Sequence, residues 1–133
     1  MIPPLKLQIR FADLDILGHV NNSIYLTYFE LARLHYFRFL VGDHWDWKKD
    51  GMVLVKNEVE YLKPVLVTDN PEIELMLANI GTKSFTLYYE LTVNGLLYTK
   101  GISVQVCYDS ISGQSIQIPS QMLDALNKLK KMA

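Results

Sequence analysis

The sequence has one cysteine, no excess of either charge and no long apolar run, and each of these absences excludes a class of protein. Cys107 cannot form a disulfide within the chain, and a single thiol is too few for a structural zinc site. Thirteen basic and fourteen acidic residues give a net charge of -1, whereas nucleic-acid-binding domains usually carry a strong basic excess. No apolar stretch approaches the roughly 20 residues that cross a bilayer, and the first residues do not resemble a signal peptide. We therefore expect a cytoplasmic protein that binds neither nucleic acid nor membrane.

What is present fits one folded domain. The chain has 133 residues and 15.3 kDa, and half of its residues are apolar. That length and composition can fill a single hydrophobic core. No repeat, low-complexity tract or linker divides the chain, so we expect one domain over residues 1–133.

The order of elements predicts an α+β fold with an antiparallel sheet. Apolar and polar residues alternate over residues 5–11, which is typical of a half-buried strand. A helix is expected from Ile24 to about Val41, capped by Asn21, Asn22 or Ser23. The pattern then predicts four strands and a last helix, at residues 52–61, 72–80, 85–93, 96–108 and 120–131. Asn94-Gly95 is a strong hairpin signal between the last two strands.

The long helix is apolar around most of its circumference. Such a helix is buried nearly all round, and a curved sheet wrapped about it would achieve this in a small domain. Glu30 and Arg33 lie three residues apart on it and are placed to pair. Trp45 and Trp47, in the loop that follows, need burial or a partner chain.

The residues from Arg10 to Asn22 hold the chemistry of the chain. Two carboxylates, a histidine and two amides lie in the turn that enters the helix. Unpaired N–H groups at a helix N-terminus can stabilise an oxyanion that develops on a carbonyl. A carboxylate just before that terminus can attack the carbonyl or activate a water molecule. The alternative is that these Asp, Asn and Gly residues only form a turn.

These residues also resemble a known family. The stretch Phe11-Ala12-Asp13-Leu14-Asp15-Ile16-Leu17-Gly18-His19-Val20-Asn21-Asn22, followed by Tyr25-Leu26, Tyr28-Phe29-Glu30 and Ala32-Arg33, is similar to the signature of hotdog-fold thioesterases. The branch is that of 4-hydroxybenzoyl-CoA thioesterase and related acyl-CoA thioesterases. Looser similarity continues over residues 59–65 and 80–85 and ends near residues 118–119. The resemblance implies a hotdog fold, in which a curved antiparallel sheet of about five strands wraps around one long central helix.

The resemblance also implies roles for particular residues. Asp15 matches the catalytic carboxylate, as nucleophile or general base, and the backbone N–H near Asn22 matches the oxyanion donor. We expect Gly18 and Asn21 to lie against the substrate, and His19 to orient the loop or substrate or to act as a general base. Asp13 is expected to be structural, as a turn cap or a partner of Arg10. The reaction needs no cofactor.

Other residues are candidates for binding coenzyme A and the acyl group. Lys63 and Lys83 can act as point charges on phosphate, and Ser84 belongs to the Gly81–Ser84 turn that could present N–H groups to the same anion. Tyr25 would line the acyl pocket, although it could equally be a core residue. Cys107 has no base near it in the sequence, and we expect it in the core.

Three functions fit the pattern. The leading one is hydrolysis of an acyl- or aroyl-CoA to a carboxylate and free CoA. An acyl-carrier-protein thioesterase would need a basic docking surface, which a near-neutral chain does not suggest. A non-catalytic acyl-thioester binding module would tolerate loss of the carboxylate, and Asp15 is present. Family members form dimers whose sheets join side by side, often as dimers of dimers, so a homodimer is expected at least and a homotetramer is the fuller expectation.

Overall fold

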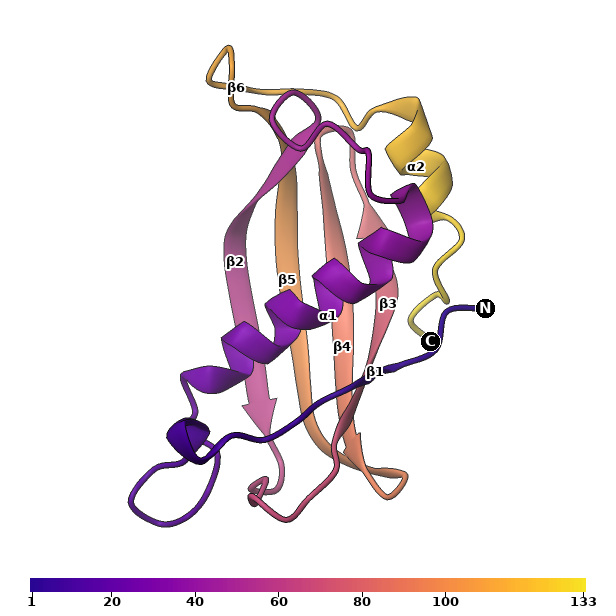
Figure 1. Cartoon of the computed structure of the whole chain (residues 1–133). Helices are drawn as coiled ribbons and strands as arrows, with labels where there is room; N and C mark the ends of the chain where they lie inside the picture. The colour runs from indigo at the N-terminus through magenta and orange to yellow at the C-terminus, as the bar shows by residue number, and fades with distance from the viewer.

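In a computed structural model of residues 1–133, one curved antiparallel sheet carries a long helix across its concave face (Figure 1). The sheet order is β1-β3-β4-β5-β2, and a short sixth strand, β6, pairs with β5. The elements are β1 (Leu5–Lys6), a 3-10 turn η1 (Phe11–Asp13), α1 (Ile24–Val41), β2 (Gly51–Tyr61), β3 (Glu72–Ile80), β4 (Ser84–Val93), β5 (Leu96–Asp109), β6 (Gln114–Ser115) and α2 (Ser120–Leu126). This confirms the α+β class and the central helix.

The predicted hairpin joins β4 to β5. Asn94 and Gly95 both take positive φ, at 51° and 79°, which is the tight turn that this dipeptide favours. The strands then pair from Val93 with Leu96 as far as Ser84 with Val106. Long β2 pairs only with β5 and forms an edge of the sheet, with a bulge between Leu54 and Lys56.

Helix α1 is buried on one face only, which corrects the expectation of burial nearly all round. Its buried side chains pack against the concave face of the sheet and are Tyr25, Tyr28, Phe29, Ala32, Tyr36 and Phe37. On the other face Leu34 is 62% exposed and Phe39 is 58% exposed. One sheet reaches only one side of a helix, so the second apolar face stays uncovered in a single chain.

Two predicted elements are shorter than expected. Only Leu5 and Lys6 pair as a strand, because the chain then turns into η1, where Asp13 bonds back to Arg10. Helix α2 ends at Leu126 instead of near residue 131. The residues after it leave the helix to bond with the edge of β3, where Lys130 C=O accepts from Leu77 N–H at 2.8 Å.

In the loop before β2, one tryptophan is held by a hydrogen bond within the loop and the other stays partly exposed. Trp45 Nε1–H donates to Asp50 C=O at 2.8 Å, whereas Trp47 remains 41% exposed beside Phe37. None of the helices has the length and hydropathy that a transmembrane segment requires.

Candidate active site

Residues 14–20 form a small hairpin directly before α1. Leu14 pairs with Val20, and Asp15 N–H donates to His19 C=O at 2.7 Å. Gly18 closes the turn with a φ of 77°, a left-handed conformation that glycine adopts without strain. Val20 N–H donates to Val65 C=O at 2.8 Å and anchors the hairpin to the loop after β2. The hairpin therefore holds Asp15, Gly18 and His19 close together directly before α1.

The two oxygens of the Asp15 carboxylate have different surroundings. Oδ1 accepts from Leu17 N–H at 2.9 Å and from His19 N–H at 3.1 Å. Oδ2 makes no hydrogen bond within the chain, and the residue is only partly buried. One oxygen thus fixes the orientation of the carboxylate, while the other is free for a water molecule or a substrate.

The start of α1 leaves one backbone donor unused. Ser23 is the N-cap position of α1 but makes no side-chain cap bond, whereas Asn21 Oδ1 accepts from Ser23 N–H at 3.0 Å in the turn just before the helix. Asn21 C=O accepts from Ile24 N–H at 2.9 Å. Asn22 N–H, between them, has no acceptor in the chain, and the residue is exposed. It is the kind of orphan donor that an oxyanion at a helix N-terminus would use.

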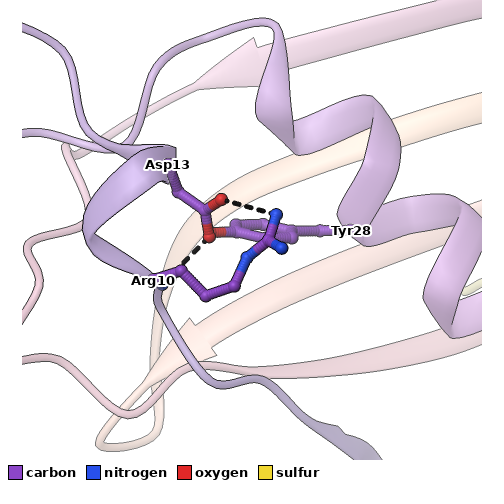
Figure 2. A network of polar contacts seen from close by, with 3 residues as sticks. All are labelled: Arg10, Asp13 and Tyr28. Carbon is purple, nitrogen blue, oxygen red and sulfur yellow. Dashed lines mark hydrogen bonds and ion pairs between the residues drawn. The ribbon is translucent and has the colours of Figure 1, made fainter.

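Asp13 is structural, and its network joins η1, the turn directly before the hairpin, to α1 (Figure 2). Its carboxylate accepts from Arg10 N–H at 3.0 Å, from Arg10 Nη2 at 3.1 Å and from Tyr28 O–H at 2.7 Å. The side chain is 1% exposed. Burial raises the pKa of the Asp13 carboxyl, but the bonds from Tyr28 and Arg10 outweigh it, so the pKa lies below its usual value. Asp13 is therefore ionised, and both of its carboxylate oxygens accept hydrogen bonds, whereas Asp15 keeps one oxygen free.

Two tyrosine side chains, Tyr25 and Tyr61, pack against each other at the start of α1. Tyr25, expected to line the acyl pocket, is 2% exposed, and its ring meets Tyr61 edge-on with centroids 5.0 Å apart. Burial raises the pKa of the Tyr25 and Tyr61 phenols, so both are neutral hydrogen-bonding groups at pH 7. Tyr61 O–H donates to Asn22 C=O at 2.9 Å and holds the peptide that follows the free N–H.

The structure separates the candidate phosphate-binding residues. Lys63 follows β2 at the end of the sheet where the hairpin lies, and its Nζ is 5.1 Å from the centre of the Tyr98 ring (Figure 1). Lys83 ends the β3–β4 turn and Ser84 begins β4, at the opposite end of the sheet (Figure 1). Within one chain they are therefore far from Asp15, and they could serve its site only from a partner chain. Cys107 is buried, which confirms its place in the core, and burial raises its pKa to about 11.

A polar network between α1 and the sheet was missed in the sequence. Arg33 does not pair with Glu30, which is exposed and makes no ion pair. Arg33 Nη1–H instead donates to Tyr89 O–H at 2.9 Å, across 56 residues of sequence. An arginine in an otherwise apolar helix was the available signal, but its partner comes from β4. The same face of α1 borders a cavity of about 840 Å³ that extends to β2.

Comparison with known proteins gives the class. The sequence model of the thioesterase-like superfamily matches residues 9–126. A thioesterase from Thermus thermophilus, solved with coenzyme A and zinc, superposes with a TM-score of 0.83 at 33% identity, over 93% of this chain and 90% of that chain. The fold is thus that of the hotdog thioesterases, and the chain belongs to the thioesterase-like superfamily of thioester hydrolases.

Individual relatives differ in what their names say they hydrolyse. The 1,4-dihydroxy-2-naphthoyl-CoA hydrolase of Nostoc punctiforme is 30% identical over 60% of this chain. The long-chain acyl-CoA thioesterase FadM of Escherichia coli is 24% identical over 95% of this chain and 98% of its own length. Curated relatives at 30–31% identity are matched over only 54–56% of their own length. The relatives therefore span aromatic and long aliphatic acyl groups and do not single out one substrate.

Proposed function

We propose that the protein is an acyl-CoA thioesterase that uses the Asp15 carboxylate and the Asn22 backbone N–H. The observation that carries the proposal is the free Oδ2 of a carboxylate whose other oxygen is fixed by Leu17 and His19, in a hairpin that ends at an unused helix donor. Family membership and relatives named as CoA thioesterases support coenzyme A as the thiol carrier.

The reaction follows from these two groups. The thioester carbonyl oxygen accepts from Asn22 N–H, so that the negative charge forming on it meets the positive end of the α1 dipole. Asp15 Oδ2 then attacks the carbonyl carbon, the C–S bond breaks, and CoA leaves as its thiolate. Water hydrolyses the resulting anhydride and restores the carboxylate. In the second route Asp15 removes a proton from water while the water oxygen bonds to the carbonyl carbon. The C–S bond then breaks, and the leaving thiolate takes the proton from Asp15, which gives the acid and free CoA.

His19 serves the site through its backbone in this proposal. Its N–H donates to Asp15 and its C=O accepts from Asp15, while its ring makes no hydrogen bond within the chain. We therefore assign His19 to positioning the loop. The narrower 4-hydroxybenzoyl-CoA branch, the roles of Lys63, Lys83 and Ser84 in phosphate binding, and a cytoplasmic location stay predictions.

The test of the function is thiol release by the wild-type protein from short, medium, long and aryl acyl-CoA substrates. Steady release from one or more of them, with free carboxylate formed in equal amount, is the expected result. Binding of these thioesters without thiol release would contradict hydrolysis and favour a binding module. Release from acyl carrier protein thioesters but not from the CoA panel would contradict CoA as the carrier.

A further inference from the structure

Asn22, whose N–H is the free donor at the start of α1, is held by a side chain from the sheet. Tyr61 O–H donates to Asn22 C=O at 2.9 Å, and no other side chain bonds to Asn22. Asn22 is exposed, and the N-cap residue Ser23 makes no side-chain cap bond beside it. The direction of the Asn22 N–H therefore depends on few contacts, of which the bond from Tyr61 is one.

Two hydrogen bonds fix the two peptide groups on either side of Asn22. The preceding peptide carries the free N–H, and its carbonyl, Asn21 C=O, accepts from Ile24 N–H at 2.9 Å. The following peptide carries Asn22 C=O, which accepts from Tyr61. Because a peptide group is planar, a bond to its carbonyl restricts the orientation of the whole group. Loss of the Tyr61 bond would free the second plane and let residue 22 rotate about its φ and ψ.

Tyr61 is itself fixed by the sheet and by a buried ring. It is the last residue of β2 and pairs with Thr99 of β5, so its backbone belongs to the sheet. Its ring meets the Tyr25 ring edge-on with centroids 5.0 Å apart, and Tyr25 is 2% exposed. The phenol oxygen of Tyr61 is therefore a hydrogen-bond donor with a defined position.

The same packing reaches the start of the segment that contains Asp15. The Tyr25 ring meets the Tyr28 ring with centroids 6.1 Å apart, and Tyr28 O–H donates to the Asp13 carboxylate at 2.7 Å. Tyr28 thus holds the chain just before the hairpin, and Tyr61 holds it just after. This row of three tyrosines restricts movement of the Asp15 hairpin relative to the helix donor, which is what a reaction with a developing oxyanion requires.

We propose that Tyr61 is a positioning residue, whose phenol directs the Asn22 N–H toward the oxyanion and so raises kcat without touching the substrate. The inference rests on the proposed thioesterase function. A donor in an oxyanion site is effective when it already points at the place where charge develops. Asn22 is exposed, so water can replace the phenol at its C=O, and the fold should lose little stability. Catalysis and stability are thereby separable at Tyr61.

The test uses Tyr61→Phe, which removes the hydroxyl and keeps the ring that packs on Tyr25. Tyr88→Phe is the matched control, because Tyr88 O–H also makes one hydrogen bond, to Glu90 within β4 at 3.1 Å. kcat and KM are measured for thiol release from the best substrate of the wild type. The carbonyl stretch of that substrate, isotopically labelled at the thioester carbon, is recorded by infrared difference spectroscopy on Asp15→Asn, alone and combined with each phenylalanine substitution.

The expected result for Tyr61→Phe is a fall in kcat of about 5- to 30-fold, with KM within about twofold, because the oxyanion donor is loosened and not removed. Tyr88→Phe should change kcat by less than about twofold. On Asp15→Asn the bound carbonyl should absorb at a lower frequency than in buffer, since a hydrogen bond from Asn22 N–H weakens the C=O bond. Adding Tyr61→Phe should reverse much of this shift, and adding Tyr88→Phe should leave it unchanged.

Several outcomes would overturn the inference and leave the thioesterase function standing. They are an unchanged kcat in Tyr61→Phe, a change confined to KM, and a carbonyl shift that survives the substitution. Unfolding of Tyr61→Phe under assay conditions, or a smaller oligomeric mass, would also overturn it, since the phenol would then serve the fold or the contact between copies. No thiol release by the wild type, or a bound carbonyl that absorbs as in buffer, would instead contradict the proposed function itself.

Discussion

At the scale of single residues, Asp13 and Asp15 are two carboxylates in one short loop with opposite tasks. Asp13 is buried and has three hydrogen bonds, whereas Asp15 keeps one oxygen free. We expect Asp13→Ala to lower the free energy of unfolding by roughly 2–3 kcal/mol, because it leaves Tyr28 O–H and the Arg10 N–H without an acceptor. Urea denaturation of both proteins at pH 7 checks this, and a change below about 0.5 kcal/mol would contradict the structural role.

The same carboxylate predicts a pH dependence of stability. Its pKa in the folded protein is below the ordinary value of 3.8, so its ionisation stabilises the fold above about pH 4, and this stabilisation is lost as the pH falls through the folded pKa. The stability difference between wild type and Asp13→Asn should therefore be full at pH 6 and shrink as the pH falls below about 4. A difference that grows on acidification would have the wrong sign for this account.

Residue-level prediction from sequence succeeded for one local contact and failed for another, and it did not find the distant ones. The pairing of Asp13 with Arg10 spans three residues, and the sequence offered it as one of two alternatives, beside a turn cap. The bond from Tyr28 to Asp13 spans fifteen residues and that from Arg33 to Tyr89 spans 56, and both depend on how α1 lies on the sheet. Spacing along a helix suggested Glu30 for Arg33, but a buried phenol on β4 offered the closer acceptor.

At the scale of elements, the contact between α1 and β5 depends on a residue without a side chain. A Cβ at Gly101 would lie 2.5 Å from Phe29 Cε2, and Phe29 stacks on Tyr89 with ring centroids 4.5 Å apart. Gly101→Ala should push Phe29 off this stack and destabilise the protein by about 1–3 kcal/mol. The midpoints of thermal unfolding of Gly101→Ala and Gly95→Ala are compared. A Cβ at Gly95 would have open space, but the residue has a positive φ, so Gly95→Ala measures backbone strain, whereas Gly101→Ala measures overpacking. An unchanged unfolding midpoint in Gly101→Ala would contradict the close packing.

The long elements were predictable and the short ones were not. The bounds of α1 match the expected Ile24–Val41, because the segment has no Gly or Pro and ends at Gly42, where φ is 77°. Strands β2 to β5 lie within one residue of their expected ends. The first strand and α2 were overestimated, since hydrogen bonds from η1 and from the β3 edge compete with the local pattern.

At the scale of the whole molecule, the uncovered surfaces predict self-association. The edge strand β2 exposes Val53, Leu54 and Val55, at 39%, 43% and 58%, and the outer face of α1 exposes Leu34 beside it. The unpaired backbone N–H and C=O groups of an apolar edge strand can pair with a strand of another chain. We expect a dimer of twice 15.3 kDa, in which β2 strands of two copies meet, with a tetramer as the larger assembly.

Light scattering of a double substitution tests this assembly. Val53→Lys with Val55→Lys should yield monomers at concentrations where the wild type is dimeric, because two lysines charge the edge. Ile111→Lys is the control, since Ile111 is 75% exposed outside β2. A monomeric wild type would contradict self-association, and dimers that survive the double substitution would place the contact elsewhere.

The central claim is that the Asp15 carboxylate carries the hydrolysis. The direct measurement is kcat/KM for thiol release by Asp15→Asn, on the best substrate of the wild type. Asparagine keeps an oxygen for the loop N–H groups, but it replaces the free, charged oxygen by an amide nitrogen that can neither attack nor take a proton. Asp109→Asn is the matched control, because Asp109 Oδ1 likewise accepts two loop N–H groups, from Ile111 and Ser112. We predict a fall of at least about 100-fold for Asp15→Asn and less than about twofold for Asp109→Asn. Equal activity of Asp15→Asn and wild type would contradict the claim.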